Sequence, residues 1–219
     1  MGFHGIEVVW EQRELMVDGL LATLAIAVVS AVLSGLVGVG LFGLLISRRR
    51  AVTGLVSGLI DLMRCVPFML FCYMIYFALP AFGVLIDNIE AGVLALTLYN
   101  AAYIAELLHG TWKTLPAETL EAGHAFGFHG WRLVLRIILP PVVMDSVPML
   151  GNQMVQIIKD SAFLVIIAVQ ELTYAANEIQ ATYYVPFASF VCAVILYWLL
   201  CLLIEGGVRA VVRVAELRR

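Results

Sequence analysis

The sequence predicts an all-α integral membrane protein with five transmembrane helices, and residues 1–219 are expected to form a single transmembrane domain. Two observations carry this prediction. Hydrophobic residues make up 63% of the chain, charged residues make up only 13%, and the mean hydropathy is +0.99. Soluble globular proteins are about half apolar and about a quarter charged. In addition, the apolar residues fall into long runs that are separated by short polar segments.

Each of the five apolar runs reaches the roughly 20 residues that a helix needs to cross the hydrocarbon core. The first two are long and rich in Gly and Ala, so tilted or extended helices are expected there. The N-terminus lacks the basic segment and the small-residue cleavage site of a signal peptide, so the first run is expected to remain as a helix. Residues 1–17 give no specific signal. The expected spans are 18–46, 52–80, 90–110, 146–169 and 187–208.

The distribution of Lys and Arg predicts the orientation of these helices. With the N-terminus outside, ten of the 13 Lys and Arg residues fall in cytoplasmic segments and Arg13 alone falls outside. Cytoplasmic loops carry an excess of such residues. The N-terminus is therefore expected outside, the C-terminus in the cytoplasm, and residues 111–145 in the largest cytoplasmic loop. The ten residues are Arg48, Arg49, Arg50, Lys113, Arg132, Arg136, Arg209, Arg213, Arg218 and Arg219.

The loop 111–145 is expected to contain two short helices. Pro116 suits the first turn of a helix, and Gly127 suits the stop at its C-terminal end. A second, amphipathic helix is expected from Trp131 to Ile138, ending at the pair Pro140-Pro141. Two short helices hinged at a glycine either dock a cytoplasmic partner or lie on the lipid surface.

The middle and end of this loop carry a motif. Its residues are Glu121, Ala122, Gly123, Gly127, Ile137, Leu139 and Pro140. Their identity and spacing resemble the EAA loop of ABC-importer permeases, which reads Glu-Ala-Ala, three residues, Gly, nine residues, Ile, one residue, Leu, Pro. Only Gly123 departs from the motif, replacing an alanine at an expected cost of about 1 kcal/mol in helix stability. The resemblance implies that the loop fits a groove on an ATP-hydrolysing subunit and transmits its closure to the membrane helices.

Further stretches resemble one branch of these permeases, the polar amino-acid uptake family. The stretch LMRCVPFMLFCYMIYFALP is similar to the Arg-Gly-Thr-Pro segment of the branch's second helix, with Arg64 and Pro67 both present. The stretches AAYIAELLHGTWKTLPAETLEAG and NQMVQIIKDSAFLVIIAVQEL match the branch in order and spacing. The resemblance runs from about residue 58 to the C-terminus.

The resemblance implies a permease subunit in a bacterial cytoplasmic (inner) membrane that takes up a polar amino acid or a related zwitterion. It implies as partners two copies of a cytoplasmic ABC ATPase, a second permease that is identical or homologous, and a periplasmic or surface substrate-binding protein. The chain has no Gly-rich phosphate loop ending in Gly-Lys-Ser/Thr, so ATP and Mg²⁺ are expected on the ATPase. No cofactor of its own and no nucleic-acid partner are expected.

Polar residues inside a membrane cost free energy and are therefore functional candidates. In the fourth run, Gln153, Gln156 and Asp160 are spaced i, i+3, i+7 and share one helix face. In the third run, Tyr99, Tyr103 and Glu106 share a face by i, i+4, i+7. These faces either line a cavity for a zwitterion, with Asp160 accepting its ammonium group, or form hydrogen bonds between helices. The resemblance implies a substrate site on these helices, with an acidic residue where Asp160 stands.

Asp61, Arg64 and Pro67 are interpreted as structural residues within the membrane. Asp61 and Arg64 are spaced i, i+3, so an ion pair between them would lower the cost of burying charge. Pro67 is expected to kink the helix just beyond this pair. His124 and His129 do not share a helix face and have no third ligand nearby, so no metal site is expected.

Two other classes of function stay open on the sequence. A small intramembrane enzyme would use Glu106, Asp160 or a histidine as acid or base, but no nucleophile and base stand at a recognisable spacing. An ion-driven carrier is the second class, but five helices without an internal repeat are too few for its usual inverted halves. An odd number of helices with one long loop favours half of a pore, completed by a second permease subunit.

Overall fold

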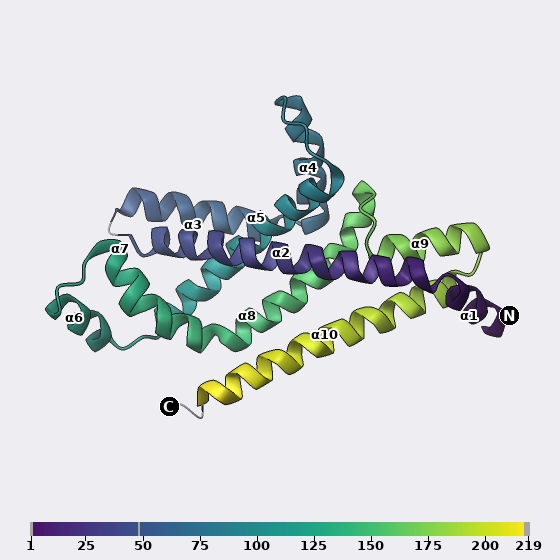
Figure 1. The fold of residues 1–219 in the computed structure, drawn as a ribbon. Coiled ribbons are helices and arrows are strands. Elements are labelled where there is room, and N and C mark those ends of the chain that lie inside the picture. The colour runs from purple at the N-terminus through teal and green to yellow at the C-terminus, as the bar shows by residue number, and fades with distance from the viewer. Residues whose placement is uncertain (1, 48, 217–219) are drawn as a thin grey trace.

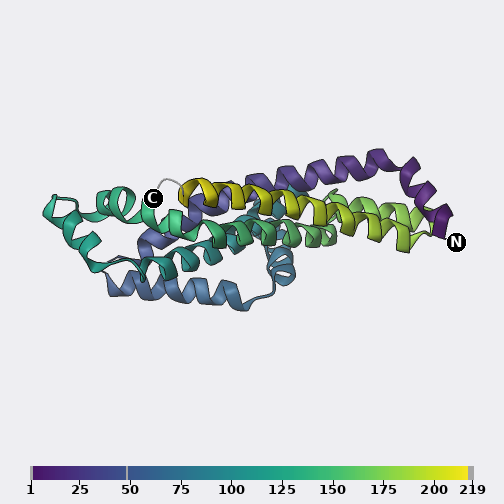
Figure 2. The same cartoon turned by 90° about the horizontal axis from the view of Figure 1, so that it is seen from below.

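The computed structural model describes residues 2–47 and 49–216, and all regular structure in these ranges is helical. The helices form an elongated bundle (Figures 1 and 2). In chain order they are α1 (Gly2–Glu11), α2 (Arg13–Leu45), α3 (Arg50–Cys65), α4 (Phe68–Ala81), α5 (Asn88–Trp112), α6 (Ala117–Ala125), α7 (Gly130–Leu133), the π-helix η1 (Val134–Ile138), α8 (Leu139–Ser161), the 3₁₀-helix η2 (Ala162–Ile167), α9 (Leu172–Tyr183) and α10 (Pro186–Glu216).

Four helical segments of the described chain are long and apolar enough to cross a membrane. The bent pair α3–α4 is a fifth candidate if its two halves count as one span. The predicted all-helical class is confirmed, and the described chain offers four or five candidate crossings. The expected spans 18–46, 90–110 and 187–208 fall on α2, α5 and α10. The four segments are Arg13–Leu45, Asn88–Trp112, Gly130–Ile167 and Pro186–Arg213.

The expected span over 52–80 is divided into two helices at the position where a kink was predicted. α3 ends at Cys65, α4 begins at Phe68, and the two helices are bent by 108° at this break. The residue before a proline avoids the helical conformation, and Val66 accordingly has an extended backbone with ψ of 134°. Pro67 shares that extended ψ. The kink expected at Pro67 is therefore a full break in the helix.

The expected end of a helix at Pro140-Pro141 is also wrong. One helical segment runs from Gly130 to Ile167, so the fourth span begins well before residue 146. A π-helical turn accommodates the prolines, because the Leu139 amide donates to the Val134 carbonyl five residues back. The prolines then occupy the first turn of α8, where a missing N–H costs little.

α2 and α5 pack along much of their length, and α8 lies against both. Small residues let the helix backbones approach closely, as they do in membrane helix bundles. A Cβ atom added to Gly38 of α2 would lie 2.7 Å from Cγ2 of Ile104 on α5. The Ser34 hydroxyl donates across the same interface to the Thr97 carbonyl at 3.2 Å. This packing holds α5 and α8 side by side. These two helices carry the polar faces that were predicted in the third and fourth apolar runs.

The two ends of the bundle differ (Figure 1). One end holds α1, α9 and the α9–α10 connection, and the opposite end holds α6, α7, the start of α3 and the end of α10.

α9 was not expected from the sequence, and a buried acid holds its first turn in place. The Glu171 carboxylate accepts from the amides of Thr173 and Tyr174 at the start of α9 and from the Tyr197 hydroxyl of α10. Burial raises the pKa of Glu171, and these hydrogen bonds oppose that shift.

At the opposite end, the last turns of α2 pack closely on α7. Gly43 faces the Trp131 indole so closely that an added Cβ atom would collide with the ring. Gly35, about two turns earlier on the same helix, has open space where its Cβ atom would be. The contact between α2 and α7 therefore depends on the absence of a side chain at Gly43.

We expect Gly43→Ala to destabilise the bundle relative to Gly35→Ala. Both substitutions gain a helix propensity of about 1 kcal/mol. Only Gly43→Ala forces the half-exposed Trp131 indole to shift, and overpacking costs about 1–3 kcal/mol. Thermal unfolding of the purified proteins in detergent should give a lower midpoint for Gly43→Ala and an unchanged or higher midpoint for Gly35→Ala. Equal midpoints would contradict the tight packing of Trp131.

Candidate functional site

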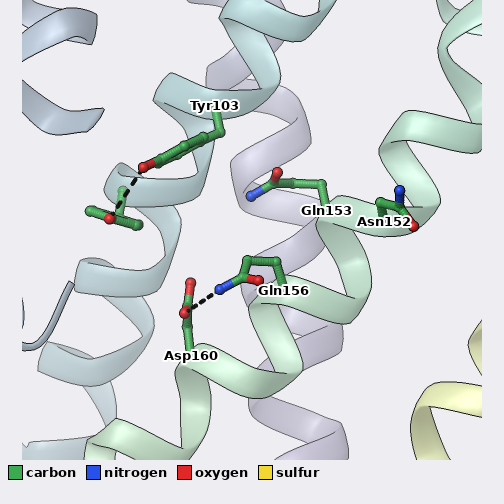
Figure 3. Close-up of a pocket in the computed structure, with 6 residues that line it drawn as sticks. Tyr103, Asn152, Gln153, Gln156 and Asp160 are labelled. Atoms are coloured by element: carbon green, nitrogen blue, oxygen red, sulfur yellow. Dashed lines mark hydrogen bonds between the residues drawn. The ribbon is translucent and has the colours of Figure 1, made fainter. Parts of the chain in front are cut away.

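A polar cavity of about 350 Å³ lies between α5 and α8. The structure thus brings together five of the six residues that the sequence grouped on these two faces, all but Glu106, and Asn152 joins them. Figure 3 shows the α8 side chains and Tyr103 around this space. The lining residues are Tyr99 and Tyr103 from α5, and Asn152, Gln153, Gln156 and Asp160 from α8.

The start of α5 is fixed by a local signal in the sequence. The Asp87 carboxylate accepts from the Glu90 amide at 2.7 Å, and the Glu90 carboxylate accepts from the Asp87 amide at 3.1 Å. This capping box satisfies two amides that the first helical turn leaves free. With the start fixed, the helical period places Tyr99 and Tyr103 on one side, facing α8.

Asp160 is the acidic group of the cavity, and it is only 4% exposed. Its Oδ1 atom accepts a hydrogen bond from Gln156 Nε2 at 2.8 Å (Figure 3). Its Oδ2 atom is buried and has no partner within hydrogen-bond distance in the described chain, although the Asn100 amide lies close enough to stabilise the carboxylate. Buried polar atoms are nearly always hydrogen-bonded, so this carboxylate oxygen is open to a donor brought by an occupant of the cavity.

Gln153 makes its hydrogen bond to a residue that the sequence did not single out. Its Nε2 atom donates to Asn100 Oδ1 at 2.6 Å. Asn100 is fully buried on α5, and its Nδ2 atom donates to the Leu96 carbonyl at 2.9 Å. The signal that marks Asn100 is a carboxamide within a membrane-spanning helix, beside Tyr99.

The two tyrosines of the cavity wall are tied to the break between α3 and α4. The Tyr99 hydroxyl donates to the Val66 carbonyl at 3.2 Å, and the Tyr103 hydroxyl donates to the Arg64 carbonyl at 3.3 Å. A helix that ends leaves such carbonyls without an intrahelical partner. The two phenol oxygens also lie 3.3 Å apart, within hydrogen-bond distance of each other (Figure 3), so the tyrosines are engaged with the break and with one another and offer the cavity their ring faces.

The expected ion pair between Asp61 and Arg64 does not form; among the described residues no salt bridge joins them. Asp61 is exposed, and the Arg64 guanidinium instead lies 5.7 Å from the centre of the Tyr103 ring. Such a cation–π contact needs the cation over the ring face, and the bend at Pro67 leaves Arg64 beside α5. Arg64 is not among the residues that line the cavity.

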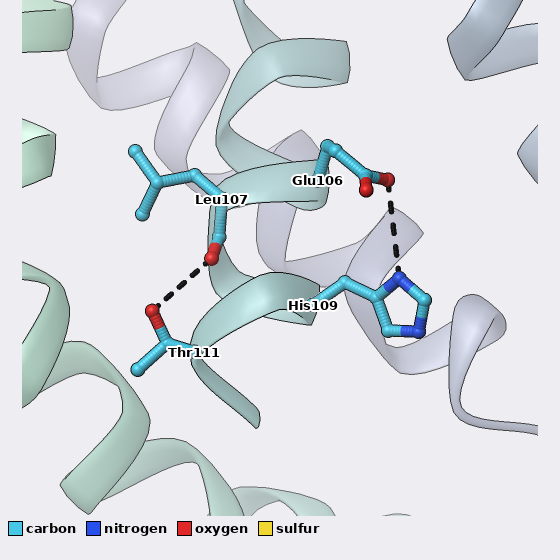
Figure 4. A network of polar contacts seen from close by, with 4 residues as sticks. All are labelled: Glu106, Leu107, His109 and Thr111. Atoms are coloured by element: carbon cyan, nitrogen blue, oxygen red, sulfur yellow. Dashed lines mark hydrogen bonds and ion pairs between the residues drawn. The ribbon is translucent and has the colours of Figure 1, made fainter. Parts of the chain in front are cut away.

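Glu106 does not line the cavity, although it follows Tyr99 and Tyr103 on the same helix. Figure 4 shows its carboxylate beside His109, with Oε2 at 3.8 Å from Nδ1. One turn further, the Thr111 hydroxyl donates to the Leu107 carbonyl at 3.2 Å. These contacts lie within α5, so Glu106 has a local partner and does not reach the acid of the cavity.

The helix α6 ends as the sequence predicted. It begins directly after Pro116, and Gly127 follows its C-terminal end with φ of +81°. The Phe128 amide donates to the Gly123 carbonyl at 3.0 Å, and the Gly127 amide donates to the His124 carbonyl at 2.9 Å. This pair of hydrogen bonds is a Schellman motif, which favours glycine at the left-handed position.

Gly123 attaches α6 to the rest of the bundle. It is buried, and an added Cβ atom would lie 2.6 Å from Cδ1 of Leu133 and 3.2 Å from Cγ2 of Ile137. The glycine that departs from the EAA motif thus allows α6 to lie close to α7 and η1. The opposite face of α6 is open, with Glu121, Ala122 and Phe126 exposed.

The two histidines of the loop bind its backbone. His124 Nδ1 lies 3.2 Å from the Phe128 carbonyl oxygen, and His129 Nδ1 lies 3.0 Å from the Gly127 carbonyl oxygen. Their rings are 5.3 Å apart between centres. Within the described ranges, no group of three His, Cys, Asp or Glu side chains is arranged to hold a metal ion.

The sequence matches a known family over residues 36–215, the family described as binding-protein-dependent transport system inner membrane component. It is 34% identical over 180 residues to the glutamine transport system permease protein GlnP of Escherichia coli K12, an alignment that covers 79% of this chain and 80% of that protein. It is 28% identical over 203 residues to the probable glutamine ABC transporter permease protein GlnM of Bacillus subtilis 168, covering 93% and 94% of the two chains.

Two solved structures share the fold. A chain from the crystal structure of an amino acid ABC transporter with histidines superposes with a TM-score of 0.84 at 24% identity, covering 94% of this chain and 96% of that one. A chain of the inward-facing MetNI methionine ABC transporter superposes with a TM-score of 0.70 at 25% identity, covering 91% and 97%. The arrangement of helices around the cavity is therefore one that solved transporter chains share.

Proposed function

The chain belongs to the family of binding-protein-dependent transport system inner membrane components, and from this premise we propose that it carries a polar amino acid or a related zwitterion into the cytoplasm. It is the permease subunit of an ABC importer, and it is a transport subunit rather than an enzyme. Neither the intramembrane enzyme nor the ion-driven carrier gains support from its relatives.

The cavity between α5 and α8 is the observation that carries the choice of cargo. Its volume of about 350 Å³ suits a small molecule, and its lining is polar inside an otherwise apolar bundle. The open oxygen of Asp160 suits an ammonium group, and the carboxamides of Gln153 and Gln156 suit the remaining polar groups of an amino acid. Relatives named as glutamine, L-cystine and arginine permeases agree with this cargo class.

The loop residues Glu121, Ala122, Gly123 and Gly127 are proposed to couple transport to ATP hydrolysis. The partners proposed for this task are two copies of a cytoplasmic ABC ATPase, which bind ATP and Mg²⁺, together with a second permease subunit, identical or homologous. A substrate-binding protein delivers the cargo. The open face of α6 supports the docking role, because Phe126 is 83% exposed at the tip of the loop. Exposed aromatic side chains of this kind are frequent at protein interfaces.

The proposed orientation has the N-terminus outside and the C-terminus in the cytoplasm of a bacterial cell. The segments that carry Arg49, Lys113, Arg132 and Arg209 gather at the end of the bundle that holds α6 and α7, and Arg13 lies toward the other end (Figure 1). An excess of basic residues marks the cytoplasmic side. This distribution supports a multi-pass protein of the cytoplasmic membrane with α6 inside.

Cysteine labelling tests this orientation. In a background with the four native cysteines replaced by alanine, Asn177→Cys on α9 should react with a membrane-impermeant maleimide in intact cells. Phe126→Cys after α6 should react only once the membrane is opened, because the bilayer separates the two ends of the bundle. The reverse pattern would overturn the orientation, and with it the docking role of the loop.

Charge reversal on α6 tests the docking role. We expect Glu121→Lys to lower the amount of ATPase that co-purifies with the permease by about tenfold, the effect of about 1.4 kcal/mol. The side chain is exposed, so the permease itself should keep its yield and its unfolding midpoint. Glu178→Lys is the matched control, because it makes the same change at an exposed site on α9 at the opposite end. Normal ATPase recovery with Glu121→Lys would contradict the docking role.

Removing the charge of Asp160 tests the cavity. Asp160→Asn keeps the size of the side chain and an oxygen for the hydrogen bond from Gln156, so the complex should assemble normally. Transport should weaken by a charge-assisted hydrogen bond, about 1.5–3 kcal/mol, or roughly ten- to a hundredfold. Asp61→Asn, an exposed site outside the cavity, should leave uptake unchanged. Unchanged uptake with Asp160→Asn would exclude this acid from the cargo site.

A further inference from the structure

Asn100 is a fully buried carboxamide that joins the two helices of the cavity. It does not line the cavity itself. Its Oδ1 atom accepts from Gln153 Nε2 at 2.6 Å, across the interface between α5 and α8. Its Nδ2 atom donates to the Leu96 carbonyl at 2.9 Å, one turn earlier on its own helix. The side chain is thus held at both ends.

These two hydrogen bonds fix which way the Gln153 amide is turned. A backbone carbonyl only accepts hydrogen bonds, so the Leu96 carbonyl requires the NH₂ group of Asn100 on its side. The Asn100 oxygen must then face Gln153, and an oxygen there requires the NH₂ group of Gln153. The Gln153 carbonyl oxygen is left without a partner among the described residues, on a side chain that lines the cavity.

We propose that Asn100 is a positioning residue that selects the cargo through Gln153. Asn100 holds the Gln153 NH₂ group, so the Gln153 carbonyl oxygen is the atom that this side chain presents to the cargo. The inference rests on the proposed function, in which Asp160 receives the ammonium group. Gln153 stands seven residues from Asp160, about 10 Å along the helix. The two acceptors therefore meet different parts of the cargo.

The chemical consequence is a preference for side chains that donate hydrogen bonds. L-Glutamine presents an NH₂ group to the Gln153 oxygen. L-Glutamate has nearly the same shape, but it presents only oxygens, so it would leave two acceptors facing each other. A site that accepts a hydrogen bond from its ligand discriminates strongly against an analogue without the donor. An apolar pocket discriminates less between similar ligands. When Asn100 no longer holds it, the Gln153 amide can turn over and offer its NH₂ group to a carboxylate.

Equilibrium binding of L-glutamine and L-glutamate to the receptor-free permease–ATPase complex in lipid nanodiscs tests this inference. The wild-type complex should bind L-glutamine more tightly. Asn100→Leu should lower the ratio of the two dissociation constants by about three- to tenfold. Complex yield is measured for every variant. Thr97→Val is the matched control, since Thr97 is a buried polar residue of the same helix that does not line the cavity; it should leave the ratio unchanged.

Gln153→Leu and the double variant Asn100→Leu/Gln153→Leu separate positioning from structure. If Asn100 acts through Gln153, the double variant should discriminate no worse than Gln153→Leu alone. The double variant leaves no unpaired buried amide, so it should assemble even if Asn100→Leu alone does not. Two outcomes overturn the inference and leave the proposed function standing. In the first, Gln153→Leu lowers the ratio of dissociation constants but Asn100→Leu keeps the wild-type ratio. In the second, the double variant discriminates between the two amino acids less well than Gln153→Leu. A wild-type complex that binds neither of the two overturns the inference, and one that binds no polar amino acid at all overturns the proposed function as well.

Discussion

In the hydrocarbon interior every backbone polar group needs a partner within the protein, and an unpaired carbonyl there costs several kcal/mol. The break between α3 and α4 creates this problem at Arg64 and Val66, because no helical amide follows to satisfy their carbonyls. The hydroxyls of Tyr103 and Tyr99, on α5, donate hydrogen bonds to these two carbonyls. The same side chains form one wall of the polar cavity. The bend of one helix pair and the shape of the cavity are therefore set by the same two hydrogen bonds.

The same requirement explains how the loop is joined to the cavity. Two consecutive prolines would ordinarily end a helix, because neither supplies an amide hydrogen. The π-helical turn from Val134 to Ile138 shifts the hydrogen bonds just before them, and the chain stays helical from Gly130 to Ile167. The residues that pack against Gly123 and the residues that line the cavity thus belong to one helical segment. The contact of α6 with Leu133 and Ile137 is therefore joined to Gln153 and Asp160 by one helical segment.

Within the cavity, the hydrogen bonds of the protein leave acceptors open. The tyrosine hydroxyls donate to backbone carbonyls, the Gln156 amide donates to Asp160, and the Gln153 amide donates to Asn100. The second oxygen of Asp160 has no donor within the described chain. An amino acid brings an ammonium group to such a site and satisfies a group that is otherwise buried without a partner. This chemistry fits the class of cargo that we propose for the chain.

The sequence by itself determined whatever depends on one helix at a time. Hydropathy placed α2, α5 and α10, the helical period grouped Gln153, Gln156 and Asp160, and Gly127 stopped α6 through a left-handed turn that suits glycine. The tertiary structure decided everything that depends on a partner from another helix. It made Pro67 a break rather than a kink, carried the helix through Pro140-Pro141, turned Arg64 to Tyr103 instead of Asp61, and gave Asn100 its role beside Gln153. The reason is physical: a side chain's direction follows from its own helix, but its hydrogen-bond partner follows from which helix packs against it.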